Sequence, residues 1–279
     1  MLKGTDFAVT FWGVRGSVPC PGLSTLRYGG NTSCVEVRCG EHRLILDAGT
    51  GLRELGQVIG GSDGTLRAHI FFSHTHLDHI GGLPFFRPAY REGNCFEFWG
   101  GHLKSRGASL RQVLETLLQP PLFPVPLNIL HSCVAFHDFD AGQTLEPFEG
   151  VTVRTIPLDH PGGATGYRIE FGGRSLCFIT DVEHAVGETS CDLVSFVRDS
   201  DLMIYDTTYT DEEFLEFKGW GHSTWQQGIR ICEQADVTQL ACFHHDPRRT
   251  DSELDKIAEV VANARRGSVV AREGLTLFL

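Results

Sequence analysis

The sequence lacks the features that mark several classes of protein. No run approaches the ~20 apolar residues that a helix needs to cross a bilayer, and Met1–Asp6 lack the long apolar stretch of a signal peptide. The nine cysteines are odd in number and contain no C-x-x-C pair. This argues against a disulfide framework and favours a reducing compartment. The sequence therefore predicts a cytoplasmic protein that does not span a membrane.

Basic clusters are scarce as well. The chain has 24 Lys and Arg against 35 Asp and Glu, a formal net charge of −11, and its densest basic pairs are Arg248-Arg249 and Arg265-Arg266. Proteins that follow nucleic acid along its backbone usually carry a basic stripe, so we expect no extended nucleic-acid partner. Bound divalent cations would offset the charge locally, and acidity therefore does not exclude a phosphate-bearing substrate. The oligomeric state, a homo-oligomer included, is left open.

Short apolar runs separated by glycines predict a layered α/β fold. Hydrophobic residues make up 41% of the 279 residues and include 19 Phe, which suffices for a sizeable core. Neither a linker nor a repeat divides the chain, so we expect a single domain over residues 1–279, with two sheets packed face to face and helices outside. The runs predict strands over Phe7–Trp12, Cys34–Arg38, Leu44–Leu46, Ala68–Phe72, Phe96–Trp99, Val151–Ile156, Gly166–Phe171, Ser175–Ile179, Leu202–Tyr205 and Leu240–Phe243.

Helices are fewer in this pattern. One has the apolar spacing of a helix packed on a sheet and should end at Pro120-Pro121; its stripe is Leu110, Val113, Leu114, Leu117 and Leu118. A second should begin near Ser223, which stands three residues before Gln226 in the spacing of a capping box. A third should begin near Thr250, with Glu253 in the same relation.

One hexapeptide concentrates metal-ligating side chains, namely His74-Thr75-His76-Leu77-Asp78-His79, directly after the apolar run Ile70–Phe72. Imidazole is the commonest metal ligand in proteins, and imidazole with carboxylate suits zinc, iron or manganese. A strand that ends in a tight loop would fan these side chains around one point, and Gly81-Gly82 permits close backbone approach. The segment favours two neighbouring metals over one.

A single loop supplies too few ligands for two metals, so the others should follow later strands. Three residues come at the end of an apolar run in this way: His160, Asp181 and His244. His184 competes for the same role near Asp181, and His245 competes with His244. Strand register favours His244, because a slip of one residue reverses the face of the sheet.

The ordered set of motifs resembles the metallo-β-lactamase-fold hydrolases, from about Asp47 to Asp246. The resemblance implies a four-layer αββα sandwich with two divalent cations at one edge between the sheets. Zinc would be the metal, with iron and manganese as alternatives. By the resemblance, the first metal is held by His74, His76 and His160, the second by Asp78, His79 and His244, with Asp181 bridging them and Asp47 supporting the ligands from outside.

A second motif narrows the resemblance. Gly221-His222-Ser223-Thr224, ahead of a helix and the last ligand, resembles the tRNA 3′-end endonucleases of the ribonuclease Z type and related phosphodiesterases. There His222 would lie near the scissile phosphate and give a proton to the leaving oxygen; the alternative is a histidine that only precedes a helix. The chain departs from the tRNA endonucleases in lacking their Gly/Pro- and Lys-rich arm.

Other segments have less defined roles. Trp12–Ser17 and Tyr28–Cys34 contain glycines that permit approach to a site, so that Arg15 or Asn31 would contact a ligand, or they are tight turns that lead into strands. Tyr209 and Trp220 are candidate pocket walls. Five further histidines should be ordinary core or surface residues: His42, His69, His102, His131 and His137.

Together these features predict a dinuclear metal-dependent hydrolase. We expect a phosphodiesterase in which metal-activated water attacks a nucleotide or short nucleic-acid phosphodiester, with Asp78, Asp181 and His222 as catalytic residues. The alternatives are a hydrolase of carboxylic esters, thioesters or lactones, and a metal-containing sensor or binding protein with little turnover.

Overall fold

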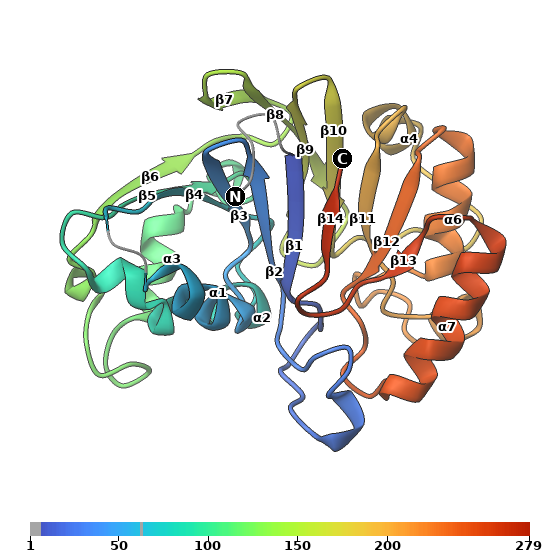
Figure 1. Ribbon diagram of the computed structural model, residues 1–279, viewed down its shortest axis with the longest axis horizontal. Coiled ribbons are helices and arrows are strands. Elements are labelled where there is room, and N and C mark those ends of the chain that lie inside the picture. Colours follow the sequence, from blue (N-terminus) through green and yellow to red (C-terminus); the bar gives the residue numbers. More distant parts are fainter. Residues whose placement is uncertain (1–6, 62–63) are drawn as a thin grey trace.

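The computed structural model describes residues 7–61 and 64–279; Met1–Asp6, for which no signal peptide is expected, lie outside them. Two seven-stranded sheets face each other, with helices on their outer faces (Figure 1). This confirms the predicted αββα sandwich.

The first sheet has the order β14-β1-β2-β3-β4-β5-β6 and the second the order β13-β12-β11-β10-β9-β8-β7. The first consists of β1 (Phe7–Gly13), β2 (Cys34–Cys39), β3 (His42–Leu46), β4 (Arg67–Phe72), β5 (Cys95–Gly100), β6 (Cys133–Asp138) and β14 (Thr276–Phe278). The second consists of β7 (Thr144–Phe148), β8 (Val151–Leu158), β9 (Ala164–Phe171), β10 (Arg174–Ile179), β11 (Leu202–Asp206), β12 (Gln239–Phe243) and β13 (Val269–Val270).

The described helices lie between these strands in the chain. The α-helices are α1 (Gly51–Ile59), α2 (Leu77–Ile80), α3 (Leu110–Leu117), α4 (Cys191–Val197), α5 (Asp211–Phe214), α6 (Trp225–Gln234) and α7 (Asp251–Ala264). The 3₁₀ helices are η1 (Leu23–Thr25), η2 (Leu83–Phe85), η3 (Arg87–Tyr90), η4 (Lys104–Arg106) and η5 (Leu127–Ile129). In the described part of the chain, none of them is both long and apolar enough to cross a bilayer.

Every predicted strand is present to within a few residues, whereas β6, β7, β13 and β14 were not predicted. β6 and β7 are only partly buried, and β13 and β14 are two and three residues long. β13 and β14 are too short to show a pattern and β7 contains Pro147, whereas β6 begins with the apolar run Cys133–Phe136, which is as long as the runs of some predicted strands. The helices α1, α2, α4 and α5 were also not predicted.

Of the two predicted capping boxes, one is present and one is not. The Thr250–Glu253 box caps α7, and α3 is present as expected. The predicted box at Ser223 is wrong, because the Thr224 hydroxyl accepts the hydrogen bond from the Gln227 backbone N–H instead. Ser223 is drawn inward, where its hydroxyl lies 2.8 Å from that of Tyr205.

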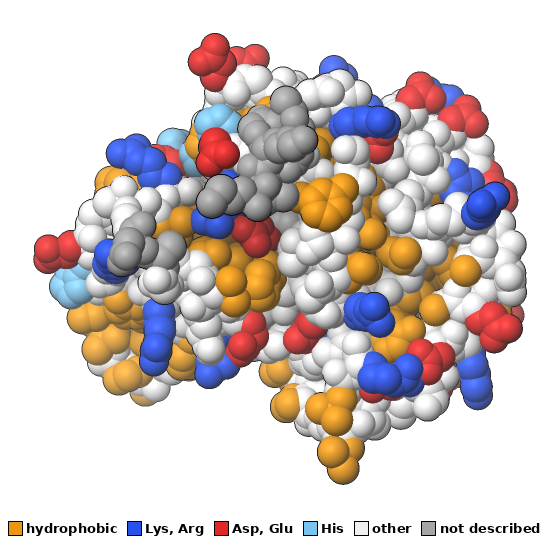
Figure 2. All heavy atoms as spheres, viewed as in Figure 1, with side chains coloured by type: hydrophobic (Ala, Val, Ile, Leu, Met, Phe, Trp, Pro, Cys, Tyr) orange, Lys and Arg blue, Asp and Glu red, His pale blue; other side chains and the backbone are white. Residues whose placement is uncertain are grey.

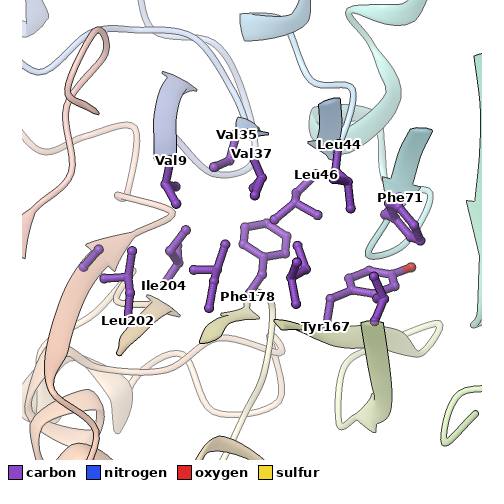
Figure 3. Packing of buried hydrophobic residues seen from close by; sticks show 14 of the residues in the cluster. Val9, Val35, Val37, Leu44, Leu46, Phe71, Tyr167, Phe178, Leu202 and Ile204 are labelled. Carbon is purple, nitrogen blue, oxygen red and sulfur yellow. The ribbon is translucent and has the colours of Figure 1, made fainter. Parts of the chain in front are cut away.

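Apolar side chains from both sheets fill the space between them. Figure 3 shows this packing, in which side chains of the first sheet meet those of the second, among them Val37, Leu46, Phe71, Tyr167 and Phe178. Two further clusters join the outer sheet faces to helices, with α1 and α3 on the first sheet and α4, α6 and α7 on the second. The burial of these surfaces stabilises the sandwich at roughly 25 cal/mol per Å² of apolar area.

The strand directions bring one end of many strands to a common edge. β3, β4, β5 and β6 run parallel, as do β10, β11, β12 and β13. β8 shares their direction within the second sheet, since β9 is antiparallel to both β8 and β10. Residues that directly follow β3, β4, β8, β10, β11 and β12 can therefore meet at the same edge.

One buried cation ties the N-terminal loop to the end of the chain. Arg15 is 0% exposed, and its guanidinium donates hydrogen bonds to the backbone carbonyls of Gly29, Asp246 and Arg249 at 2.8 to 3.2 Å. We expect Arg15→Met to lower the free energy of unfolding by at least about 3 kcal/mol, because the buried carbonyls lose their donors. Chemical denaturation checks this, with the exposed Arg266→Met as control; equal midpoints for the two variants would contradict it.

Candidate metal centre

Five strand ends supply the polar residues of one buried site. Asp47 follows β3, and the hexapeptide begins two residues after β4. His160 lies two residues after β8, while Asp181 and His244 lie at the ends of β10 and β12. The hexapeptide does not continue as a loop, because Leu77 to Ile80 form the short helix α2 with His76 at its N-cap.

Three of these residues adopt the left-handed backbone conformation. The φ angles are 63° at Asp47, 55° at Asp181 and 59° at His244. This region is costly for residues other than glycine, and Asp and His tolerate it better than branched residues. The left-handed conformation turns the backbone sharply after each of the three strands. All three residues are buried at the site.

The seven predicted ligands come together as two groups joined by one carboxylate. In the first group, ring nitrogens of His74, His76 and His160 lie within 4.8 Å of one another. In the second group, carboxylate oxygens of Asp78 and Asp181 and ring nitrogens of His79 and His244 lie within the same distance of one another. Asp181 Oδ2 lies 3.6 Å from Nε2 of both His74 and His160. Its Oδ1 lies 3.3 Å from His79 Nε2 and 3.2 Å from His244 Nε2.

The chemistry of these donors fits two divalent cations. Nε2 of His74 and of His79 is buried and makes no hydrogen bond of good geometry with any described residue, an arrangement that costs free energy unless a ligand is present. Burial lowers the pKa of the His74 and His160 imidazoles, which keeps them in the neutral form that binds metals. Burial alone would raise the pKa of Asp181, but the imidazoles of His244, His79 and His74 hold it well below its usual range.

Outer hydrogen bonds fix how the imidazoles are turned. Asp47 Oδ2 lies 2.7 Å from His79 Nδ1. His160 Nδ1 lies 2.8 Å from the carbonyl oxygen of Gly221, and His244 Nδ1 lies 3.1 Å from the Thr208 hydroxyl. These contacts leave Nε2 of each ring directed at Asp181, the arrangement by which outer partners orient metal ligands.

His222 lies against both groups without belonging to either triad. Its Nδ1 is 2.9 Å from Asp206 Oδ2 and 3.9 Å from Asp181 Oδ2, and its ring stacks on His244 with centroids 4.9 Å apart. Burial acts to lower the pKa of His222, but Asp206 outweighs it and raises the pKa to about 9. Besides the two ligand groups, the site therefore contains His222, which the buried Asp206 carboxylate orients.

The sequence analysis did not single out Asp206, although a signal was present. It directly follows the apolar run Leu202–Tyr205, as Asp181 follows its own run. Asp206 is 0% exposed, and its Oδ1 accepts hydrogen bonds from the backbone N–H and the hydroxyl of Thr208. A stricter application of the strand-end criterion finds it.

The predicted competitors are placed elsewhere. His245 points away from the two groups, and its Nε2 lies 2.8 Å from the carbonyl oxygen of Ala271. His184 lies parallel to Tyr205 at 6.5 Å and is in neither group. His102 approaches the edge of the site, with Nε2 3.1 Å from the Thr75 hydroxyl.

The N-terminal loop reaches the site through residues other than those predicted. The Ser17 backbone N–H donates a 2.7 Å hydrogen bond to Asp78 Oδ2, and Gly16 is packed on the His244 ring. Arg15 is 0% exposed and donates to backbone carbonyls, which fits the alternative of a tight turn, and its contact with a ligand stays a prediction. Asn31 donates from its amide to Glu273, at 3.1 Å, which fits the alternative of a turn that leads into a strand.

Gly16 is a position where a methyl group would disturb the second group of ligands alone. A Cβ there would lie 2.3 Å from His244 Cε1. We expect Gly16→Ala to displace the imidazole and to weaken one metal by about 10- to 100-fold, the range seen when ligand orientation is lost. Metal titration measures this, with Gly61→Ala as control, where nothing lies within 4 Å. Unchanged affinity at both positions would refute the packing argument.

The two candidate pocket walls differ in exposure. Tyr209 is 4% exposed and touches His222 edge-on at 6.0 Å, while Trp220 is 63% exposed. That Tyr209 contacts a ligand stays a prediction. Figure 2 shows acidic and basic side chains interspersed on the face drawn, without a continuous basic stripe, and hydrophobic side chains at the tip of the projecting N-terminal loop, where Leu23 is 91% exposed.

Several known proteins are similar to this chain in sequence or in fold. The chain is 22% identical over 321 residues to ribonuclease Z of Haloarcula marismortui, covering 95% of this chain and 94% of the relative. Among solved structures it resembles a diphosphatase from the PhnP family, with a TM-score of 0.71, 18% identity and 97% of each chain covered. It also resembles the short form of human tRNase Z, with a TM-score of 0.69, 20% identity, and 97% and 98% covered.

A family model assigns the chain independently of these relatives. The model described as Beta-lactamase superfamily domain matches residues 42–245, which is more than half of the sequence and includes all seven predicted ligands. The metal-binding hexapeptide and the later strand-end residues thus lie in the matched segment, and the chain belongs to the β-lactamase superfamily.

Proposed function

We propose that the chain is a metal-dependent phosphodiesterase that acts on a small nucleotide or a short nucleic-acid phosphodiester. The observation that carries the proposal is the position of His222, held by Asp206 at 2.9 Å beside two ligand groups that share Asp181. A proton donor next to paired cation sites suits the departure of an alkoxide from phosphorus. The similar proteins named ribonuclease Z, tRNase Z and diphosphatase all act, by name, on phosphate bonds.

In this proposal each group of residues has one task. His74, His76 and His160 would hold one cation, and Asp78, His79 and His244 would hold the second. Asp181, whose two oxygens face the two groups, would serve both. Two divalent cations, which we propose to be zinc from the nitrogen-rich ligands, supply charge neutralisation of the phosphoryl oxygens and make water acidic.

The remaining residues position and move protons. Asp206 fixes the His222 ring through Nδ1, so that Nε2 is free to give its proton to the leaving oxygen. Asp78 accepts from the Ser17 N–H, which holds this carboxylate against the second group. His76 is exposed, whereas the other predicted ligands are buried. Substrate would therefore approach from the side of His76.

The net charge of −11 and the scarcity of Lys and Arg clusters in the sequence favour a small substrate over a long nucleic acid. We further propose that the chain works as a single domain in the cytoplasm, a location that its nine free cysteines suit.

Turnover by metal-loaded protein tests the function. Bis-p-nitrophenyl phosphate, p-nitrophenyl acetate and a thioester are offered in parallel, and we expect the phosphodiester to be hydrolysed with the highest kcat/KM. Preference for the acetate or the thioester would indicate a carboxylic ester or thioester hydrolase instead. Intact metals with no turnover of any of the three would indicate a sensor or binding protein.

A further inference from the structure

Trp220 is a large apolar side chain in an exposed position beside the site. It is 63% exposed, whereas Trp12, Trp99 and Trp225 are partly buried. Single exposed hydrophobic residues are common on protein surfaces and by themselves mean little. What distinguishes Trp220 is how the chain around it is held and what that chain touches.

The Glu183 carboxylate, which is partly buried, holds the backbone on both sides of Trp220. The Glu183 carboxylate accepts hydrogen bonds from the Gly219 N–H at 2.8 and 2.9 Å and from the Gly221 N–H at 2.7 Å. The Trp220 N–H donates to the carbonyl oxygen of Phe217 at 3.1 Å. Because the backbone is fixed before any ligand binds, little ordering entropy is lost when a ligand contacts the indole.

The same segment is in direct contact with the first ligand group. The Gly221 carbonyl accepts a hydrogen bond from His160, and a Cβ at Gly221 would lie 2.3 Å from His160 Nδ1. Gly221 has φ of 85°, which a glycine adopts without strain. Trp220 is therefore one residue from a segment packed on a ligand and two residues from His222.

A series of rings connects the indole to His222. Trp220 meets Phe217 edge-to-face with centroids 5.4 Å apart, Phe217 stacks on Tyr209 at 4.7 Å, and Tyr209 meets His222 edge-on at 6.0 Å. The edge-to-face contact and the high exposure leave at least one face of the indole open. An open indole face held at the border of a phosphodiester site is suited to stack on a planar base.

We infer that Trp220 is a specificity-determining residue that stacks on the nucleobase of the substrate, so that the site selects nucleoside phosphodiesters over diesters without a base. The inference rests on the proposed phosphodiesterase function and narrows its substrate class. The base would lie on the Trp220 side of the site, with the leaving oxygen at His222.

The test compares two diesters with the same leaving group. Thymidine 5′-(p-nitrophenyl phosphate) carries a base and methyl p-nitrophenyl phosphate does not, and the measured quantity is the ratio of their kcat/KM values. We expect Trp220→Ala to lower this ratio by about 5- to 100-fold, the range of one base-stacking contact. Trp220→Phe should keep most of the ratio, and Leu215→Ala, at a neighbouring residue 75% exposed, should leave it at the wild-type value.

A binding measurement gives a second readout that needs no turnover. Calorimetry of metal-loaded protein with thymidine 5′-monophosphate and with methyl phosphate should give a stronger preference for the nucleotide in the wild type than in Trp220→Ala. Equal ratios in wild type and Trp220→Ala, in both measurements, would overturn the inference. Wild-type protein that hydrolyses neither diester would instead overturn the phosphodiesterase proposal, and the nucleotide preference in binding would still decide the role of Trp220.

Discussion

Asp181→Ala is expected to lose both metals and to lower phosphodiester hydrolysis by at least about a thousandfold, more than the loss of one transition-state contact produces. Its two oxygens face different groups, at 3.6 Å from His74 and at 3.2 Å from His244. Without the carboxylate, the imidazoles of both groups surround a site that has lost negative charge, which disfavours divalent cations.

Metal analysis of purified protein, together with turnover, measures this effect. Asp192→Ala is the matched control, because Asp192 is an exposed carboxylate on α4. Asp47→Ala should have an intermediate effect of about 10- to 100-fold on metal affinity, since Asp47 orients the ligand His79 through Nδ1 but belongs to neither group itself. Retention of two metals by Asp181→Ala would show that Asp181 does not join the sites.

His222→Ala is expected to lower turnover by about 10²- to 10⁴-fold while metal content stays at the wild-type level. The size of the loss should depend on the leaving group, because p-nitrophenolate departs without a proton and a sugar alkoxide does not. The decrease should therefore be large for a dinucleotide and much smaller for thymidine 5′-(p-nitrophenyl phosphate).

The dependence on the leaving group separates proton donation from structural support. A variant that merely disturbs packing lowers both activities alike, so equal losses on the two substrates would remove His222 from the chemistry. His131→Ala, at an exposed histidine remote in sequence from the predicted ligands, is the matched control. Asp206→Asn should follow His222→Ala in direction with a smaller effect, because the amide still holds the ring.

The central part of the fold, and which polar residues gather at one site, could be predicted from local sequence. Buried strands such as β4 and β10 have continuous apolar runs, and a polar residue at the end of such a run lies at the sheet edge. The parallel strand order then brings His74, Asp181 and His244 to one edge. Asp206 has the same signal, because it ends the apolar run of β11.

The parts that could not be predicted depend on contacts between remote segments. Ser17 reaches Asp78 through its backbone N–H, which any residue except proline possesses, so its side chain gives no signal. Arg15 has the appearance of a ligand-binding arginine, but its Nε and Nη1 donate to three backbone carbonyls that lie 14 or more residues away in the chain. The Ser223 capping prediction failed because the Tyr205 hydroxyl competes for the Ser223 side chain.

Anomalous X-ray scattering from crystals of metal-loaded protein tests the central claim most directly. The account predicts two peaks on either side of the Asp181 carboxylate, one among His74, His76 and His160 and the other among Asp78, His79 and His244. A single peak, or peaks away from these side chains, would contradict it.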